Sequence, residues 1–214
     1  MPNWCMNSLE MEGSEKDIAE FVEKAKKHEV RTNQLDGKEW IYDTALSFDN
    51  FIPMPAELKD TRSPYKGTVS ESARLRAMYG ADNWYDWCVE HWDTKWDVDA
   101  SYSEAQRLFT FDSAWGPPIK VILAMAKQFP TIKFTLEYEE GGMGFYGTLI
   151  VKGDVTIKDE YRNDLKNGTC PQCGEFVSIK TDRECPECGK IIDKFKEEEE
   201  DAKNISKPAE NPEK

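Results

Sequence analysis

Residues 133–151 read KFTLEYEEGGMGFYGTLIV. In the first half of this stretch, Phe134, Leu136 and Tyr138 alternate with charged and polar residues, which predicts a strand with one buried face. The glycine-rich segment that follows predicts a turn, and the mixed apolar run at 145–151 predicts the returning strand. The stretch is therefore expected to form a β-hairpin at the end of a larger sheet.

The segments upstream of this hairpin form two strand–helix–strand patterns. Ile18, Phe21 and Val22 recur at helical spacing behind Ser14, whose side chain suits the helix N-cap. The expected order is strand 4–12, helix 15–28, strand 45–52, an insertion at 53–104, strand 107–112, helix 117–128 and the hairpin. Two split βαβ units predict an α+β sandwich of the ferredoxin-like type over residues 1–160, with helices on one face of a mostly antiparallel sheet.

One further pattern lies within the hairpin. The letters GMGFYG at 142–147 match a dinucleotide-binding fingerprint, but that fingerprint requires a helix after the glycines, where the N-terminus holds the pyrophosphate. A strand is predicted instead, so we assign no nucleotide site here. The chain also lacks His-Glu-x-x-His, phosphate-loop and Gly-x-Ser-x-Gly motifs. We therefore expect a protein that is not an enzyme.

A cysteine-rich segment at residues 168–193 carries the most specific motif in the chain. Two Cys-Pro-x-Cys-Gly sequences follow each other, which is typical of two metal-binding knuckles that form one tetrahedral four-sulfur site. The segment has too few bulky apolar residues to fold alone, so metal binding would supply its stability. It is predicted to be a zinc ribbon that binds one structural Zn²⁺ per chain through Cys170, Cys173, Cys185 and Cys188.

Two other readings of these cysteines are weaker. A rubredoxin-like iron site uses similar knuckles but needs a longer, aromatic-rich stretch between them, and this gap offers only Phe176. Redox Cys-x-x-Cys pairs usually begin a helix in a βαβ unit, and that context is missing.

The negative charge of zinc with four thiolates is expected to be offset by Lys180, Arg183 and Lys190.

A tryptophan-rich segment inside the insertion predicts a second helix after the one at 71–79. Asp82 is expected to be its N-cap. At 100° per residue, one face of this helix is acidic and the other is aromatic. The candidate interaction surface comprises the acidic residues Asp82, Asp86, Glu90 and Asp93 and the aromatic-face residues Trp84, Trp87 and His91.

Each of these residues also has a structural interpretation. His91 could act as a general base, but no nucleophile accompanies it, so a core histidine with hydrogen-bonded ring nitrogens is favoured. The tryptophans are favoured as core residues, and only joint exposure would make a stacking or docking groove credible. The acidic residues are expected to form a solvated face. Cys5 and Cys88 are interpreted as small buried hydrophobes.

Composition limits the partners. Among the 214 residues, 28 are Lys or Arg and 41 are Asp or Glu, which gives a net charge of −13. This charge disfavours nucleic acid and anionic membranes as partners, because both bind clustered cations.

The sequence shows no secretory signal and no membrane-spanning run, so we expect a cytoplasmic protein in a bacterial host cell, with its cysteines reduced. Residues 194–214 predict a disordered acidic tail.

Several tryptophan motifs carry a resemblance to a known family. The opening MPNWCMN, the later YGADNWYDWC with Thr94-Lys95-Trp96, and the segment 111–118 before an apolar helix are similar to the YubB-like ferredoxin-like domain family of bacteriophages and plasmids. The resemblance covers residues 1–153. It implies a ferredoxin-like fold and a mobile-element origin, and it implies no catalytic residues.

Two functional hypotheses follow. The first is a non-enzymatic, zinc-binding regulatory or protein-interaction protein of a bacteriophage or plasmid, which acts on a host protein or on another phage protein. The second is a nucleotide-binding or single-stranded nucleic-acid-binding protein, with a possible role against host defence, that uses the tryptophan-rich insertion for stacking. The acidic charge favours the first.

Overall fold

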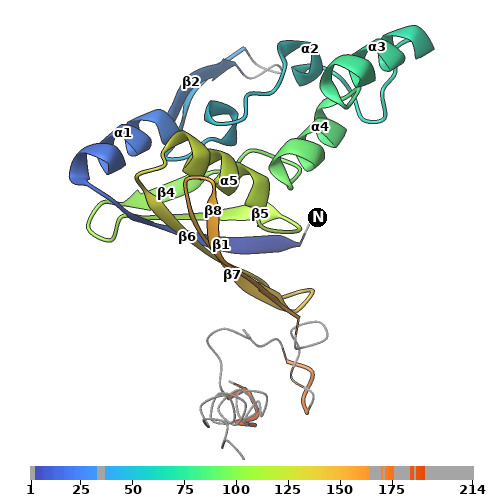
Figure 1. Ribbon diagram of the computed structural model, residues 1–214. Helices are drawn as coiled ribbons and strands as arrows, with labels where there is room; N and C mark the ends of the chain where they lie inside the picture. Colours follow the sequence, from blue (N-terminus) through green and yellow to red (C-terminus); the bar gives the residue numbers. More distant parts are fainter. Residues whose placement is uncertain are drawn as a thin grey trace, which may run out of the picture. The chain divides into compact units, whose positions relative to one another are not determined.

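Six strands form the main sheet of the computed structural model, in the order β4-β5-β1-β6-β7-β8 (Figure 1). The structure describes residues 3–32, 37–163, 170, 172–175, 184–185 and 187–190. The strands of this sheet are β1 (Trp4–Glu12), β4 (Ala100–Ser103), β5 (Leu108–Ala114), β6 (Lys133–Glu140), β7 (Phe145–Lys152) and β8 (Val155–Arg162). The remaining strands, β2 (Lys27–Thr32) and β3 (Glu39–Thr44), form a separate antiparallel hairpin.

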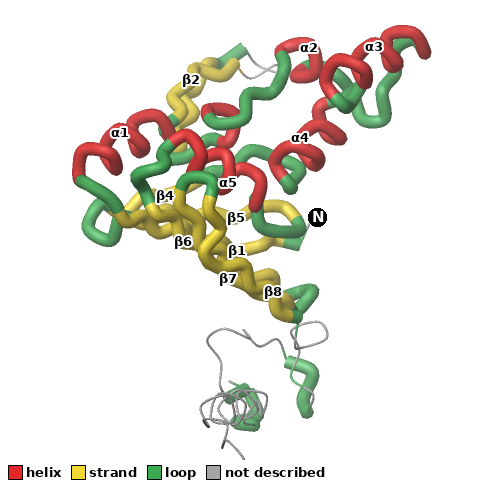
Figure 2. Tube along the Cα trace, in the orientation of Figure 1, coloured by secondary structure: helices red, strands yellow, loops and turns green. Residues whose placement is uncertain are grey.

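The helices divide between the sheet and the insertion. The helical elements are α1 (Glu15–Ala25), the short 3-10 helix η1 (Phe48–Asn50), α2 (Ala56–Lys59), α3 (Val69–Tyr79), α4 (Trp84–Trp92) and α5 (Ile119–Gln128). Helices α1 and α5 cover one face of the sheet, while α2, α3 and α4 lie beside it (Figures 1 and 2). No helix in the described part of the chain is long and apolar enough to cross a membrane.

The topology is ferredoxin-like. β1 pairs antiparallel with both β5 and β6, and β4 pairs antiparallel with β5. The units β1-α1-β4 and β5-α5-β6 therefore interleave as two split βαβ units, which confirms the predicted fold class. Strands β7 and β8 extend the sheet beyond β6, and the predicted hairpin at 133–151 is formed by β6 and β7.

Strand periodicity places the core between this sheet and its two helices. Along β1, Cys5, Leu9 and Met11 are buried, whereas Trp4 and Met6 on the other face are exposed. Phe21 of α1 stacks against the ring of Phe51 at a centroid distance of 5.2 Å. Among the described residues, the two helices cover only this face, which is why the side chains of β1 alternate between buried and exposed.

The prediction that residues 45–52 form the second strand of the ferredoxin-like motif was wrong. Residues 45–52 form a loop and η1, and the motif strand is β4, which lies inside the stretch predicted as an insertion. The first helix also ends at Ala25 and not near His28, because the chain turns into β2 at Lys27. The β2–β3 hairpin, η1 and the helices α2, α3 and α4 therefore constitute the insertion between α1 and β4.

The chain divides into two compact units. The first contains nearly all of the sheet and the helices, and the second contains the four cysteines of the C-terminal region. The predicted tail at 194–214 lies outside the described residues, as do most of the apolar positions of the cysteine segment.

Candidate metal centre and aromatic pocket

The four predicted metal-ligand sulfurs come together in the second unit. Cys170, Cys173, Cys185 and Cys188 place their Sγ atoms within 4.8 Å of one another. The Cys170–Cys188 sulfur distance is 3.7 Å, and the Cys173–Cys185 sulfur distance is 3.5 Å. A tetrahedral ion with metal–sulfur bonds of ~2.3 Å separates its ligands by ~3.8 Å. The cluster is therefore compatible with binding one metal ion.

Each cysteine pair lies on a tight turn of the same design. The N–H of Gly174 donates to the carbonyl of Cys170 at 2.9 Å, and the N–H of Gly189 donates to that of Cys185 at the same distance. Both glycines have positive φ, 75° and 66°, where a residue with a Cβ is strained. The glycine after each Cys-Pro-x-Cys motif thus lets the backbone bring two sulfurs to one side of the turn.

The turns also influence ionisation of the thiols. Backbone N–H groups at Cys173 and Gln172 favour the Cys170 thiolate and lower the pKa of that thiol to about 6. The backbone at Glu175 favours the Cys173 thiolate, but desolvation and the neighbouring sulfurs, including Cys188, together raise its pKa to about 12. Four adjacent thiolates repel one another, so full ionisation of the cluster requires a cation.

Of the three basic residues expected to offset the charge of the cluster, only Lys190 lies in the described part of the chain. Lys190 is exposed, and its carbonyl accepts a hydrogen bond from the N–H of Cys185 at 2.9 Å. Lys180 and Arg183 lie outside the described residues.

In the first unit, helix α4 begins one residue later than predicted. Asn83 is the N-cap, and its side-chain oxygen accepts a hydrogen bond from the N–H of Asp86 at 3.0 Å. Asp82 is not the cap and does not belong to a solvated face. It lies one residue before the cap, is buried, and accepts hydrogen bonds from Ser72 and Arg76 of α3. The Asn83 amide is a third donor to it, and burial with three hydrogen-bonding partners makes Asp82 a structural carboxylate.

The other predicted acidic residues divide between solvent and a contact with α5. Asp86 and Glu90 are exposed. Asp93 is half-buried, accepts a hydrogen bond from the N–H of Lys120 at 2.8 Å, and pairs with the ammonium of the same residue at 3.2 Å. Asp93 therefore caps α5, and the predicted acidic surface reduces to the two exposed carboxylates.

The aromatic face of α4 is largely core. Trp87, Cys88 and Trp92 are buried, and Trp84 is half-buried. His91 stacks on Trp87 with ring centroids 4.3 Å apart and an interplanar angle of 12°, and its Nδ1 lies 2.9 Å from the Trp87 carbonyl oxygen. These contacts place His91 in a packing role within its own helix.

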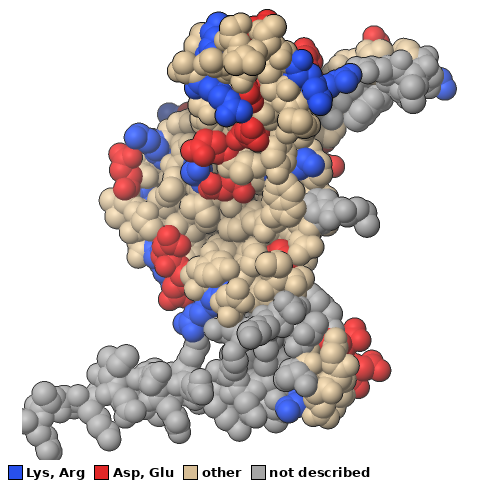
Figure 3. All heavy atoms as spheres, turned by 90° about the vertical axis from the view of Figure 1, so that its right-hand side faces the viewer, with Lys and Arg blue, Asp and Glu red and all other residues tan. Residues whose placement is uncertain are grey.

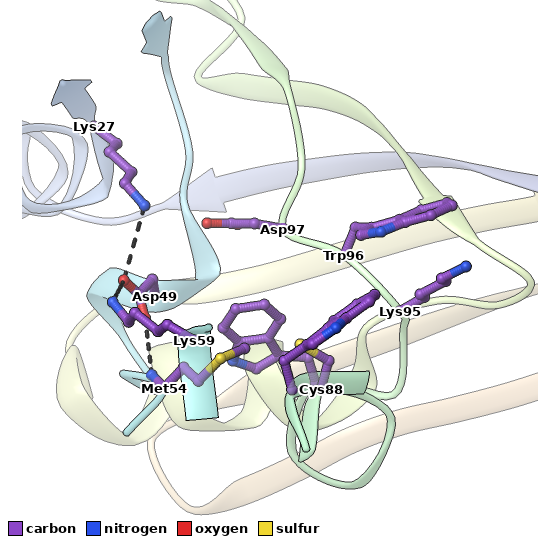
Figure 4. Close-up of a pocket in the computed structure, with 10 residues that line it drawn as sticks. Lys27, Asp49, Met54, Lys59, Cys88, Lys95, Trp96 and Asp97 are labelled. Carbon is purple, nitrogen blue, oxygen red and sulfur yellow. Dashed lines mark hydrogen bonds and ion pairs between the residues drawn. The ribbon is translucent and has the colours of Figure 1, made fainter. Parts of the chain in front are cut away.

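A pocket of about 230 Å³ lies between α4, η1 and the loop that follows α4 (Figure 4). Trp96 and Lys95 line one side, and Lys27 and Lys59 extend toward Asp49 on the other. The Asp49 carboxylate lies 3.8 Å from the Lys27 ammonium and 2.9 Å from the Lys59 ammonium. Two of the three lysines in the pocket thus share one counterion.

Two further pocket residues have unusual acid–base behaviour. Burial raises the pKa of the Cys88 thiol to about 12, which keeps it protonated and unreactive. Burial also raises the pKa of Asp97. Its carboxylate accepts hydrogen bonds from the Ser47 hydroxyl at 2.5 Å and from the N–H groups of Phe48 and Val98 at 2.6 and 3.0 Å. Asp97 therefore fastens the insertion to the segment before β4.

Next to the pocket lies a group of exposed and half-buried aromatic rings that no sequence spacing brings together. The aromatic surface comprises Trp4, Tyr85, Trp96 and Trp115: the last three lie around the ammonium of Lys95, and Trp4 contacts Trp96. Trp4, Trp96 and Trp115 are 48%, 37% and 42% exposed. These residues come from β1, α4, the loop after α4 and the residue that follows β5, so only the fold brings them together.

Comparison with known proteins bears on the later part of the first unit and on the start of the cysteine-rich segment. Residues 91–181 match a family model described as "Ferredoxin-like domain in Api92-like protein". The match begins at His91 and includes β4, β5, α5, β6, β7 and β8, but it covers less than half of the chain. No curated protein and no solved structure matches the chain. The match agrees with the ferredoxin-like topology.

Proposed function

We propose that this protein is a non-enzymatic interaction protein of a bacteriophage or plasmid, which acts by binding a host protein. The observation that carries this proposal is the aromatic surface, because three tryptophans of an acidic protein remain substantially exposed on one side. Large exposed aromatic groups are typical of protein interfaces, where tryptophan is enriched. The mobile-element origin rests on the resemblance of residues 1–153 to the YubB-like family.

We also propose that the four-cysteine cluster holds one structural Zn²⁺. Four sulfurs fill a tetrahedral coordination sphere and leave no position for water or substrate, which is the arrangement of structural zinc sites. The knuckle spacing favours zinc over iron, and the cluster would then stabilise the short segment around it.

Four side chains in the described part of the chain that could perform catalysis have structural roles instead. Burial raises the pKa of both Cys5 and Cys88 to about 12, so neither thiol is a ready nucleophile. His91 is engaged with Trp87 of its own helix. Asp97 has its oxygens occupied by three hydrogen bonds. These arrangements favour a binding function.

The proposal is tested with the purified full-length chain. We expect a 260/280 nm absorbance ratio typical of protein alone, no nucleotide in the native mass spectrum, and capture of one host protein from a bacterial extract. Capture should be lost with Trp96→Ala and retained with a control, Val69→Ala, which changes another exposed apolar residue. A co-purifying nucleotide or nucleic acid, or capture that both variants retain, would contradict the proposal.

The pocket beside α4 supports a second candidate, namely binding of a nucleotide or of single-stranded nucleic acid. Trp84 and Trp96 offer rings for base stacking, and Lys95 offers a positive charge close to them. Against this candidate, Lys27 and Lys59 are already paired with Asp49, and the chain carries a net charge of −13. The absorbance and mass measurements above decide between the two.

A further inference from the structure

We infer that the aromatic surface, together with the exposed carboxylates of Asp99 and Asp112, docks an arginine-bearing basic segment of the partner protein. This inference rests on the proposed function and specifies the chemistry of the partner. It draws on three properties of one region: exposed rings, a cation already held among them, and carboxylates at their edge.

The carboxylates lie in a groove next to the rings. Trp4, Asp99 and Asp112 line a groove of about 470 Å³ together with Thr110 and Phe111. Trp4 is also 6.0 Å from Trp96, measured between ring centroids, so it connects the groove to the other rings. A ligand that stacks on Trp4 would thus have both aspartates within reach.

The rings already accommodate a cation. The Lys95 ammonium lies 4.1 Å from the centroid of Trp96, 5.6 Å from that of Tyr85 and 5.8 Å from that of Trp115. Tyr85 and Trp115 meet at 80°, so they form two walls around this charge. The electron-rich faces of such rings attract cations. A guanidinium group of the partner would be attracted to the exposed ring faces by the same cation–π interaction.

Charge complementarity selects a basic partner. Asp99 and Asp112 are exposed, and within the described part of the chain neither of them forms an ion pair. The register of the sheet places Asp112 and Glu139 on either side of Met6, so the open sheet face near the groove is acidic. Figure 3 shows the side of the molecule at which β1 begins, with wide uncharged areas between clusters of charge. A polyanion would be repelled by these carboxylates.

Among cationic side chains, arginine fits best. Its planar guanidinium can stack on an indole while its N–H groups donate to a carboxylate, whereas lysine offers a compact, strongly hydrated charge. The groove presents both requirements side by side, because Trp4 and the two aspartates line it together.

The backbone at Trp115 supports a functional role for the surface. Trp115 has φ = 72°, which is costly for a bulky residue, and its N–H donates to the Asn3 carbonyl at 2.9 Å. The fold thus holds a large ring in a strained conformation while leaving it 42% exposed. The strain costs stability without any benefit to packing of the exposed ring, whereas a binding surface benefits from a ring held in a fixed, accessible position.

The test uses the full chain and a short fluorescent peptide of alternating Gly and Arg. The same peptide with citrulline in place of Arg removes the charge but keeps the shape, and a deoxythymidine oligonucleotide serves as the anionic probe. We expect the Arg peptide to bind at least about ten-fold tighter than the citrulline peptide and to quench tryptophan fluorescence. Asp99→Asn with Asp112→Asn should weaken binding by about five- to twenty-fold.

The matched control is Glu20→Gln with Glu23→Gln, which changes the charge equally on exposed positions of α1. It should keep the affinity within about two-fold. Trp4→Ala, with thermal unfolding as the check on folding, should reduce the quenching, of which Trp96 and Trp115 report the remainder. Equal binding of the Arg and citrulline peptides, or equal losses for the two carboxylate pairs, would overturn the inference. If a host protein is captured through Trp96 regardless of both aspartates, the proposed function stands and this inference fails. Tighter binding of the oligonucleotide would contradict both.

Discussion

The carboxylate of Asp82 lies 2.9 Å from Nε of Arg76, and this ion pair ties α3 to the start of α4. The side chain of Asp82 is only 3% exposed, although it belongs to a segment rich in solvent-facing acids. The Ser72 hydroxyl donates to the same oxygen at 2.5 Å, and the Asn83 amide donates to the other at 2.8 Å. The hydrogen bond from Ser72, followed by that from Arg76, lowers the pKa of Asp82 to about 2.

This arrangement predicts acid sensitivity that depends on Asp82. A carboxyl whose pKa is lowered in the folded state stabilises the protein above its unfolded pKa of 3.8, and this stabilisation is lost as pH falls toward about 2. Asp82→Asn should cost about 1–3 kcal/mol at pH 7, and its deficit should shrink between pH 4 and pH 2. Urea unfolding at several pH values measures this. Glu90→Gln removes an exposed carboxylate of α4 and is the matched control, and a deficit for Asp82→Asn that stays constant with pH would refute the assignment.

The cysteine cluster predicts a metal content that is sensitive to a single sulfur. Cys170→Ser replaces one thiolate with a hydroxyl that binds zinc poorly, so the variant should lose most of the metal. Elemental analysis of the wild type should give about one zinc per chain. Thermal unfolding of the first unit should be unchanged in the variant, because that unit has its own core. Iron in place of zinc would overturn the zinc assignment.

The contacts of His91 predict that its imidazole is replaceable by another flat ring. Phe at this position can keep the stack on Trp87 and loses only the polar contact to the Trp87 carbonyl oxygen. His91→Phe should therefore change the free energy of unfolding by less than about 1.5 kcal/mol and leave partner capture intact. A loss of capture in a variant with unchanged thermal stability would show that His91 acts directly in binding.

The elements that follow a simple periodicity could be predicted from the sequence. The alternation at 133–151 and the apolar spacing after Ser14 both reflect burial of one face against a neighbour. Strand β4 carries no such signal, because it is four residues long and its sequence is ASYS. It is a strand because Ala100 and Ser101 pair with Phe111 and Thr110, a contact that only the tertiary fold supplies.

The two candidate sites likewise differ in how far the sequence alone could predict them. The cysteine knuckles are local, so their spacing alone predicts that the sulfurs converge. The aromatic surface joins Trp4, Trp96 and Trp115, which are far apart in sequence and meet only after the sheet has formed. The burial of Asp82 could not be predicted from helical periodicity either. Periodicity assigns residues to the faces of one helix, but it does not show that α3 covers the start of α4.

Arg107 offers a test of backbone strain. It lies in the turn between β4 and β5 with φ = 52°, a conformation that is unfavourable for residues with a Cβ. Arg107→Gly should be more stable than Arg107→Ala by about 1 kcal/mol, because both variants lose the same side chain and only one relieves the strain. Chemical denaturation of the two variants measures the difference, and equal stabilities would show that the turn carries no strain.

Gly147 predicts the largest effect of a small substitution. Tyr138 of β6 reaches across β7 at this position, and its hydroxyl donates to the Glu160 carbonyl of β8 at 3.4 Å. A Cβ at residue 147 would collide with both the tyrosine ring and that carbonyl oxygen, so Gly147→Ala must displace β8 or the ring. We expect a loss of about 1–3 kcal/mol in the free energy of unfolding, with faster amide exchange in β8. Gly116→Ala is the matched control, because a Cβ there meets no atom within 4 Å, and it should change stability by less than about 0.5 kcal/mol. Equal stabilities of the two variants would mean that β8 does not pack against β7 as described.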